Sequence, residues 1–202
     1  MNKAELKDRL LSACQELIEH EQELSEIDSR FGDADHGLTM VKIANAIKNA
    51  SESSEGSIKT LLDDIASAVM VLNGGSAVPL WNTWLDGMQE AAKDDGDIDV
   101  QELKQIFNHA YEELEDISGA KVGDKTMMDA LIPATEAISD YDGDDIDELF
   151  NIAAKAAMEG AESSKNFVSK FGRAKSYGEK TIGTPDAGAM SMAYFFKGLA
   201  NK

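Results

Sequence analysis

The sequence has little cysteine, little proline and few basic residues. Its 202 residues include one Cys and three Pro, and 19 Lys and Arg stand against 38 Asp and Glu, which gives a net charge of −19. The single cysteine, Cys14, excludes an intrachain disulfide and a zinc cluster held by several cysteines. Nucleic acids and anionic membrane surfaces bind clustered Lys and Arg, so this charge balance argues against both as partners.

Long apolar segments are also missing. No run approaches the roughly 20 apolar residues of a membrane-spanning helix. The N-terminal residues are charged and amphipathic, unlike the apolar region of a signal peptide. We therefore expect a cytoplasmic protein that does not enter a membrane.

The residues that are abundant predict helices. Alanine occurs 26 times and valine seven times, and alanine favours helices whereas β-branched residues favour strands. Apolar residues recur at helical spacing in eight segments, of which the fourth begins at Pro79 and the sixth is kinked at Pro133. These segments are 6–18, 41–47, 58–72, 79–88, 103–117, 126 onward, 145–170 and 189–199. No segment reads as a strand and no linker interrupts the chain, so we expect one all-α domain over residues 1–202.

Four glycine-rich segments interrupt the amphipathic pattern, and each lies next to a predicted helix end. Glycine there permits unusual backbone angles and the close approach of a ligand. The segments are 32–37, 73–76, 119–126 and 171–188. We therefore expect a binding site built from helix ends.

Three carboxylates crowd the first of these segments. Asp33 and Asp35 project to the same side if the loop is extended, and Asp28 lies shortly before them. Oxygen ligands suit Mg²⁺ or Ca²⁺. The acidic loops fail the spacing of a calcium-binding EF-hand, which leaves Mg²⁺. The alternative is a simple capped turn, and spacing alone favours neither.

The residues after this loop suggest an anion site. Gly37, Leu38 and Thr39 begin a helix, whose free N–H groups and dipole favour a phosphate. Basic residues are scarce, yet Arg173, Lys175 and Lys180 gather in one glycine-rich loop, where an arginine can bind phosphate through two N–H groups. The alternative for that loop is an ordinary surface turn.

The order of these motifs resembles the nucleotide-binding L subunit of dihydroxyacetone kinases along nearly the whole chain. The motifs that carry the resemblance are Leu24 with Ile27-Asp28, Gly32-Asp33-Ala34-Asp35-His36-Gly37-Leu38-Thr39-Met40, Gly74-Gly75, Pro79-Leu80, Gly123-Asp124-Lys125-Thr126-Met127, Gly172-Arg173-Ala174, Gly178-Glu179, Ile182-Gly183, Asp186 and Gly188. The resemblance implies a closed barrel of eight antiparallel helices with the nucleotide site at one end.

The resemblance also implies a role for each site residue. Asp28, Asp33 and Asp35 would hold two Mg²⁺ ions that bridge the phosphates of ADP or ATP. Arg173 would contact the phosphates and stabilise the transferring phosphoryl group. The remaining nucleotide contacts would be His36, Gly37, Leu38 and Thr39 at the first phosphate loop, Ser76 and Ala77 at the second, Gly119 and Met127 at the adenine, and Asp186, Ala187 and Gly188 at the ribose and phosphate side.

The sequence departs from the family pattern at several of these positions. Ala77 lacks the usual hydroxyl, and Val78 replaces a glycine in the second phosphate loop. Lys180 stands where arginine is common, and Ala187 stands where proline is common. His36 separates the chain from the related fatty acid kinase nucleotide domain, which commonly carries threonine there.

The resemblance further implies that a separate K subunit holds dihydroxyacetone. The chain would pass it a phosphoryl group and be recharged by the M subunit of a phosphotransferase system, with ADP retained as a cofactor. Two alternatives stay open: an ATP-dependent kinase subunit for another short ketose, and a non-catalytic nucleotide sensor that binds a transcriptional regulator. A homodimer also stays open.

Overall fold

The elements are almost entirely helical. The computed structural model describes residues 1–94 and 96–201, and over these residues the chain forms nine α-helices, two 3-10 segments and no strand. The elements are α1 (Lys3–Glu19), α2 (Glu21–Asp28), α3 (His36–Ser53), α4 (Ile58–Met70), α5 (Ala77–Ala91), α6 (Val100–Ser118), α7 (Met128–Asp140), α8 (Ile146–Ser163), η1 (Ser164–Asn166), η2 (Arg173–Thr181) and α9 (Ala187–Ala200). None of the described helices combines the length and the apolar character of a membrane span.

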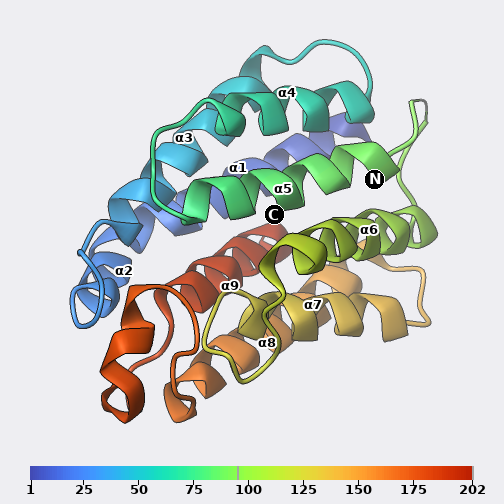
Figure 1. Ribbon diagram of the computed structural model, residues 1–202. Coiled ribbons are helices and arrows are strands. Elements are labelled where there is room, and N and C mark those ends of the chain that lie inside the picture. Colours follow the sequence, from blue (N-terminus) through green and yellow to red (C-terminus); the bar gives the residue numbers. More distant parts are fainter. Residues whose placement is uncertain (95, 202) are drawn as a thin grey trace.

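Eight of the helices form a closed ring. Each packs on its neighbours in the order α1, α3, α4, α5, α6, α7, α8 and α9, and α9 returns to α1. Connections alternate between the two ends of the ring, so successive helices run in opposite directions (Figure 1). The short helix α2 packs on α3 and α9 at one end. The predicted all-α fold is confirmed, with α2 and the two 3-10 segments as additional elements.

Aromatic side chains fill the centre of the ring. Trp81 and Trp84 on α5 meet Phe195 on α9 at ring-centroid distances of 5.2 and 5.6 Å. Further rings from α6, α8 and α9 extend this cluster, and they are Phe107, Phe150 and Phe196. All six are buried, and such rings contribute both apolar burial and edge-to-face contact. These contacts fix the distance between opposite sides of the ring.

Helix α6 starts where the capping chemistry in the sequence predicts, whereas α5 starts earlier than predicted. Asp99 caps α6 by accepting a hydrogen bond from the Glu102 N–H at 2.8 Å. Helix α5 begins at Ala77 and not at Pro79, because Ser76 already has helical backbone angles. Pro79 is therefore the third residue of the helix and not the first. Proline is tolerated there because the first N–H groups of a helix have no intrahelical acceptor.

Helix α8 ends at Ser163, and its predicted extension to residue 170 is wrong. The Ser164 hydroxyl donates to the Ala161 carbonyl at 2.5 Å and accepts from the Asp186 N–H at 2.8 Å. This buried serine therefore ties the helix end to the start of α9 and turns the chain away. The predicted starts at 126 and 189 shift to Met128 and Ala187, which lies within the usual uncertainty of helix ends.

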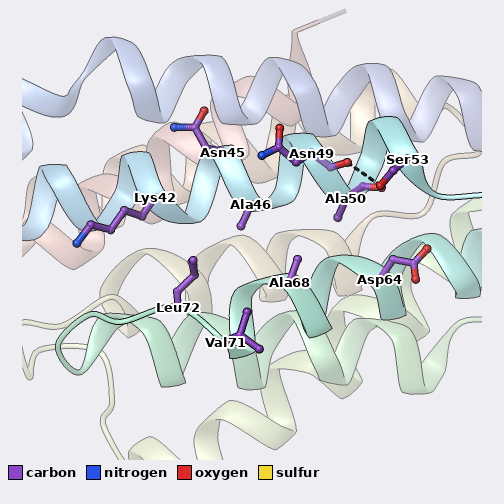
Figure 2. Close-up of a pocket in the computed structure, with 10 residues that line it drawn as sticks. All are labelled: Lys42, Asn45, Ala46, Asn49, Ala50, Ser53, Asp64, Ala68, Val71 and Leu72. Atoms are coloured by element: carbon purple, nitrogen blue, oxygen red, sulfur yellow. Dashed lines mark hydrogen bonds between the residues drawn. The ribbon is translucent and has the colours of Figure 1, made fainter.

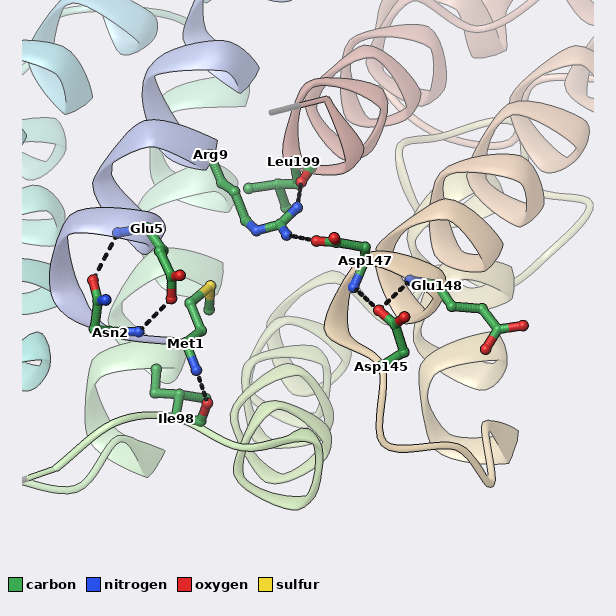
Figure 3. A network of polar contacts seen from close by, with 9 residues as sticks. All are labelled: Met1, Asn2, Glu5, Arg9, Ile98, Asp145, Asp147, Glu148 and Leu199. Carbon is green, nitrogen blue, oxygen red and sulfur yellow. Dashed lines mark hydrogen bonds and ion pairs between the residues drawn. The ribbon is translucent and has the colours of Figure 1, made fainter.

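A buried arginine joins three helices at the end of the ring near the N-terminus (Figure 3). Arg9 on α1 donates to the Leu199 carbonyl of α9 at 2.7 Å and forms an ion pair with Asp147 on α8. Its guanidinium carbon lies 4.9 Å from the centroid of the Phe150 ring. Arg9 thus joins α1 to α8, the two helices that flank α9, at this end of the ring.

Replacing Arg9 by methionine tests this role. The variant keeps the apolar stem but removes the donor to the Leu199 carbonyl and the ion pair with Asp147, so the free energy of unfolding should fall by about 1–3 kcal/mol. Urea denaturation measures it. The exposed Lys155→Met change on α8, which removes only a surface ion pair, should cost less than about 0.5 kcal/mol. An equally small loss for Arg9→Met would contradict the role.

Candidate functional site

Three carboxylates meet between α2 and α3. Asp28 is the last residue of α2, and Asp33 and Asp35 lie in the connection to α3. Each offers a ligand oxygen, and the three oxygens lie within 4.8 Å of one another. The Asp35 N–H also donates to Asp28 Oδ2 at 3.2 Å. The predicted cluster therefore exists as a group of facing carboxylates.

A glycine allows this convergence. A Cβ at Gly32 would lie 2.0 Å from Asp28 Oδ1 and 2.7 Å from its Cγ, so any side chain there would displace the carboxylate. Ala34 has a φ of 62°, a left-handed turn that brings Asp33 and Asp35 round toward Asp28. The local sequence thus builds the cluster with a glycine and a tight turn.

The electrostatics of the cluster favour a cation. Partial burial raises the pKa of Asp35, and the charges of Asp33 and Asp28 raise it further. Arg173 on η2 opposes this shift and forms an ion pair with Asp33. One arginine leaves two of three negative charges uncompensated, and the donors are all oxygens. This donor set fits Mg²⁺.

The N-terminus of α3 adjoins the carboxylates. Asp35 stands at the N-cap position, but its side chain makes no capping hydrogen bond. The Thr39 N–H donates to the Asp35 carbonyl at 2.9 Å as the first regular helical bond, which leaves the amides of His36, Gly37 and Leu38 at the helix end available to an anion. The Leu38 side chain is exposed and that of Thr39 is buried.

His36 and Gly37 also have packing roles. His36 Nε2 lies 3.0 Å from the Ser191 hydroxyl of α9, and burial lowers the pKa of its imidazole to about 4 in spite of the nearby Asp28 charge. His36 is therefore neutral near pH 7 and links α3 to α9. A Cβ at Gly37 would lie 2.0 Å from the Glu21 carbonyl, so only glycine lets α2 pack this closely on α3.

The second glycine loop lies against the first turn of α3. A Cβ at Gly74 would lie 3.1 Å from Thr39 Cγ2 and 2.5 Å from Val78 Cγ2. Ser76 is exposed, and Ala77 is the first residue of α5. The Val78 side chain is buried and contacts the loop at Gly74.

A third loop connects α6 to α7. Gly119 ends α6 in the left-handed conformation with a φ of 62°, which accounts for the glycine by helix termination alone. The fully buried Asp129 accepts hydrogen bonds from the N–H groups of Gly123 at 2.6 Å and Thr126 at 2.7 Å. Asp129 thereby fixes the loop that leads to Met127.

The start of α9 packs against this loop. A Cβ at Gly188 would lie 3.4 Å from the Met127 nitrogen. Asp186 caps α9 by accepting from the Ala189 N–H at 2.8 Å, and Ala187 is the first residue of the helix. Burial raises the pKa of Asp186 to about 7, and the N–H of Ala189 and the charge of Lys125 oppose that shift. The structure therefore brings Met127 together with Gly188.

Lys125 is a buried cation that the sequence reasoning did not single out as a site residue. Its side chain is 4% exposed, and its ammonium group donates to the carbonyls of Ser164, at 2.6 Å, and Thr184. Burial lowers the pKa of Lys125, whereas Asp186 and Asp129 raise it. Because both hydrogen bonds go to backbone carbonyls, Lys125 ties the loop between α6 and α7 to the segment between α8 and α9. The backbone φ of Lys125 is 62°, a conformation that is uncommon for residues other than glycine and that marks this position as unusual.

All of these segments lie at one end of the ring (Figure 1). The connections after α2, α4, α6 and α8 share this end. They carry every site residue predicted from the sequence apart from Asp28, at the end of α2, and those in the first turns of the following helices. A separate groove between α3 and α4 shares none of these residues, and Figure 2 shows small side chains such as Ala46 and Ala68 lining it. The carboxylate cluster is therefore the candidate site.

The fold and the site define a helical ring with carboxylates and free helix amides gathered at one end. The family description that matches the sequence is the DAK2 domain, over residues 30–201. The chain belongs to the DAK2 domain family, which confirms the resemblance drawn from the motifs.

Several relatives are kinases or kinase subunits. A D-erythrulose kinase of Mycolicibacterium smegmatis is 35% identical in an alignment 204 residues long, which covers 98% of this chain and 35% of that protein. The ADP-binding subunit DhaL of a PEP-dependent dihydroxyacetone kinase of Listeria innocua is 32% identical over 182 residues, which are 90% of this chain and 87% of that subunit. The native crystal structure of the dihydroxyacetone kinase of C. freundii has a TM-score of 0.75 and 26% identity, covering 98% of this chain and 34% of that one. The chain thus spans about a third of the larger kinases and most of the DhaL subunit.

Proposed function

We propose that the chain binds ADP or ATP with two Mg²⁺ ions and serves as the nucleotide-binding subunit of a dihydroxyacetone-type kinase in the cytoplasm. The observation that carries the proposal is the meeting of three carboxylates with the uncapped N-terminus of α3. A protein with a net charge of −19 repels a diphosphate unless cations accompany it. The cluster is suited to gather those cations beside free amides that face a phosphate.

Each segment of the site has a distinct task in this proposal. Asp28, Asp33 and Asp35 hold the Mg²⁺ ions, which when bound neutralise charge on the phosphates during transfer. The first-turn amides of α3 and the loop at Ser76 and Ala77 bind the phosphates. The adenine lies beside Gly119 and Met127, and Asp186, Ala187 and Gly188 close the ribose and phosphate side. Arg173 pairs with the phosphates as the catalytic cation.

The phosphoryl acceptor is a short ketose held on a separate K subunit. Support comes from the name of the Listeria innocua relative, because that ADP-binding subunit is covered over most of its length. Its PEP dependence further favours recharging by a phosphotransferase-system M subunit. The 35% identity to a D-erythrulose kinase supports the second candidate, an ATP-dependent kinase subunit for a four-carbon ketose.

Exposed apolar side chains support docking of a partner protein at the same end. The described residues include nine large hydrophobic side chains that are exposed, and all but Ile152 lie at the ends of helices or in loops around the candidate site. We call these eight the apolar rim: Leu38, Met70, Val71, Ile117, Val122, Phe171, Tyr177 and Ile182. A partner protein docked on exposed apolar side chains at this end would exclude water from the site during transfer.

Replacing Asp35 by asparagine tests the nucleotide site. This carboxylate makes no capping hydrogen bond, so its loss should leave the helices intact while Mg²⁺-dependent affinity for ADP falls at least about tenfold. Calorimetric titration with ADP in the presence of Mg²⁺ measures the affinity, and circular dichroism checks the helices. Asp142→Asn removes one exposed carboxylate between α7 and α8 and should change nothing. Equal affinity in both variants would refute the assignment.

Replacing Val71 by serine tests the partner and the reaction together. Burying a valine is worth about 1.5 kcal/mol, so the concentration of K subunit needed for half-maximal phosphoryl transfer to dihydroxyacetone should rise about tenfold. Affinity for ADP with Mg²⁺ should stay unchanged. Ile152→Ser, at the exposed hydrophobic outside the rim, is the matched control. Nucleotide binding by the unaltered protein without transfer to dihydroxyacetone or erythrulose would instead favour the non-catalytic sensor that binds a transcriptional regulator.

A further inference from the structure

A short segment crosses from the end of α8 to the carboxylate loop. We call residues 172–183 the strap. Gly172 and Gly183 bound it with φ values of 60° and 93°. Near its base, the Ser169 N–H donates to Thr181 Oγ1 at 3.0 Å and the Gly183 N–H donates to the Lys165 carbonyl at 2.7 Å. The strap is therefore fixed at one end and bounded by residues that permit rotation of the backbone.

Two contacts join the other side of the strap to the carboxylate loop. The Arg173 guanidinium pairs with Asp33, and the rings of Tyr177 and Phe31 lie 5.2 Å apart. The Arg173 and Asp33 side chains are 69% and 41% exposed. Ion pairs this exposed contribute little stability, so the arginine can be exchanged for another cation at low cost.

Arg173 can therefore pair with either of two anionic groups, the Asp33 carboxylate or a nucleotide phosphate. In the structure it supplies the positive charge beside Asp33, which is a ligand in the proposed metal site. A divalent ion at the three carboxylates would take up the same Asp33 oxygens and repel the guanidinium. A nucleotide phosphate would in turn attract a released guanidinium through paired hydrogen bonds.

We infer that Arg173 is an exchangeable counter-cation, which occupies Asp33 until a divalent ion displaces it and then pairs with the nucleotide phosphates. The inference rests on the proposed function, since it requires metal and nucleotide at this site. Without nucleotide, Arg173 opposes metal binding. With nucleotide, it favours the complex. Binding of the metal thus strengthens binding of the nucleotide. Binding of the nucleotide strengthens binding of the metal by the same factor, because both effects express one coupling free energy.

The test is the Arg173→Gln variant, measured with two probes. Mn²⁺ alone, followed by electron paramagnetic resonance, should bind about two- to fivefold more tightly because its competitor is gone. ADP with Mg²⁺, followed by calorimetry, should bind roughly tenfold or more weakly because the charged hydrogen bonds to phosphate are lost. Opposite changes in the two affinities are the signature of the exchange, and a general loss of structure would weaken both.

Two further variants separate the exchange from simpler effects. Lys175 lies two residues from Arg173, and its side chain has no hydrogen bond or ion pair with the described residues. Lys175→Gln removes the same charge and should leave Mn²⁺ binding nearly unchanged. Arg173→Lys keeps the charge but not the planar guanidinium, so it should still oppose Mn²⁺ while weakening the nucleotide complex.

The outcomes also separate this inference from the proposed function. If the unaltered protein binds ADP with Mg²⁺ but Arg173→Gln binds Mn²⁺ alone no more tightly, the counter-cation role is overturned and the proposed function stands. If Lys175→Gln strengthens Mn²⁺ binding as much, the effect is general electrostatics and the role is again overturned. If the unaltered protein binds neither Mn²⁺ nor ADP, the proposed function fails and the inference fails with it.

Discussion

Mutual repulsion among three carboxylates is the constraint around which one end of this molecule is arranged. Asp28, Asp33 and Asp35 present oxygens within 4.8 Å of one another in a chain that already carries a net charge of −19. Like charges at that spacing oppose one another by about 4 kcal/mol near a protein surface. Partial burial raises the pKa of Asp35, and the charges of Asp33 and Asp28 raise it further. Arg173 relieves part of this repulsion, and the proposed Mg²⁺ ions would relieve the rest.

The rest of the fold can be understood as the support for this cluster. Gly32 leaves room for the Asp28 carboxylate, and Gly37 lets α2 pack closely on α3. Neutral His36 joins α3 to α9, Asp129 fixes the loop before α7, and Lys125 ties that loop to the segment before α9. At the opposite end Arg9 joins α1, α8 and α9. The cluster thus lies on α2 and its connection to α3, and α2 is packed against α3 and α9 of the ring, which supports the carboxylates where they would meet a charged ligand.

Much of the fold could be predicted from the sequence because the helices are amphipathic and capped. The spacing of apolar residues located all eight helices of the ring, and Asp99 marked the start of α6. The errors fell where tertiary contacts decide. Ser164 ends α8 through a bond to the distant Asp186 N–H, and α2 is too short for periodicity to reveal. Ser76 took a helical conformation ahead of Pro79, which the preference of proline for the first helical position did not anticipate.

The candidate site could also be predicted in part from the sequence. The grouping of Asp28, Asp33 and Asp35 was suggested by their spacing and implied by the family resemblance, whereas the pairing of Asp33 with Arg173 joins residues 140 positions apart and could not be predicted. The Gly-Asp-Lys-Thr motif gave no hint that Lys125 is buried and donates to backbone carbonyls. Such roles depend on which segments meet in space, and only the ring of helices determines that.

Anomalous X-ray scattering from crystals grown with Mn²⁺ and ADP tests the central claim most directly. The account predicts manganese peaks within bonding distance of carboxylate oxygens of all three aspartates, with the diphosphate between the metal and the first turn of α3. Peaks elsewhere, or carboxylates turned apart into solvent beside a bound nucleotide, would contradict it.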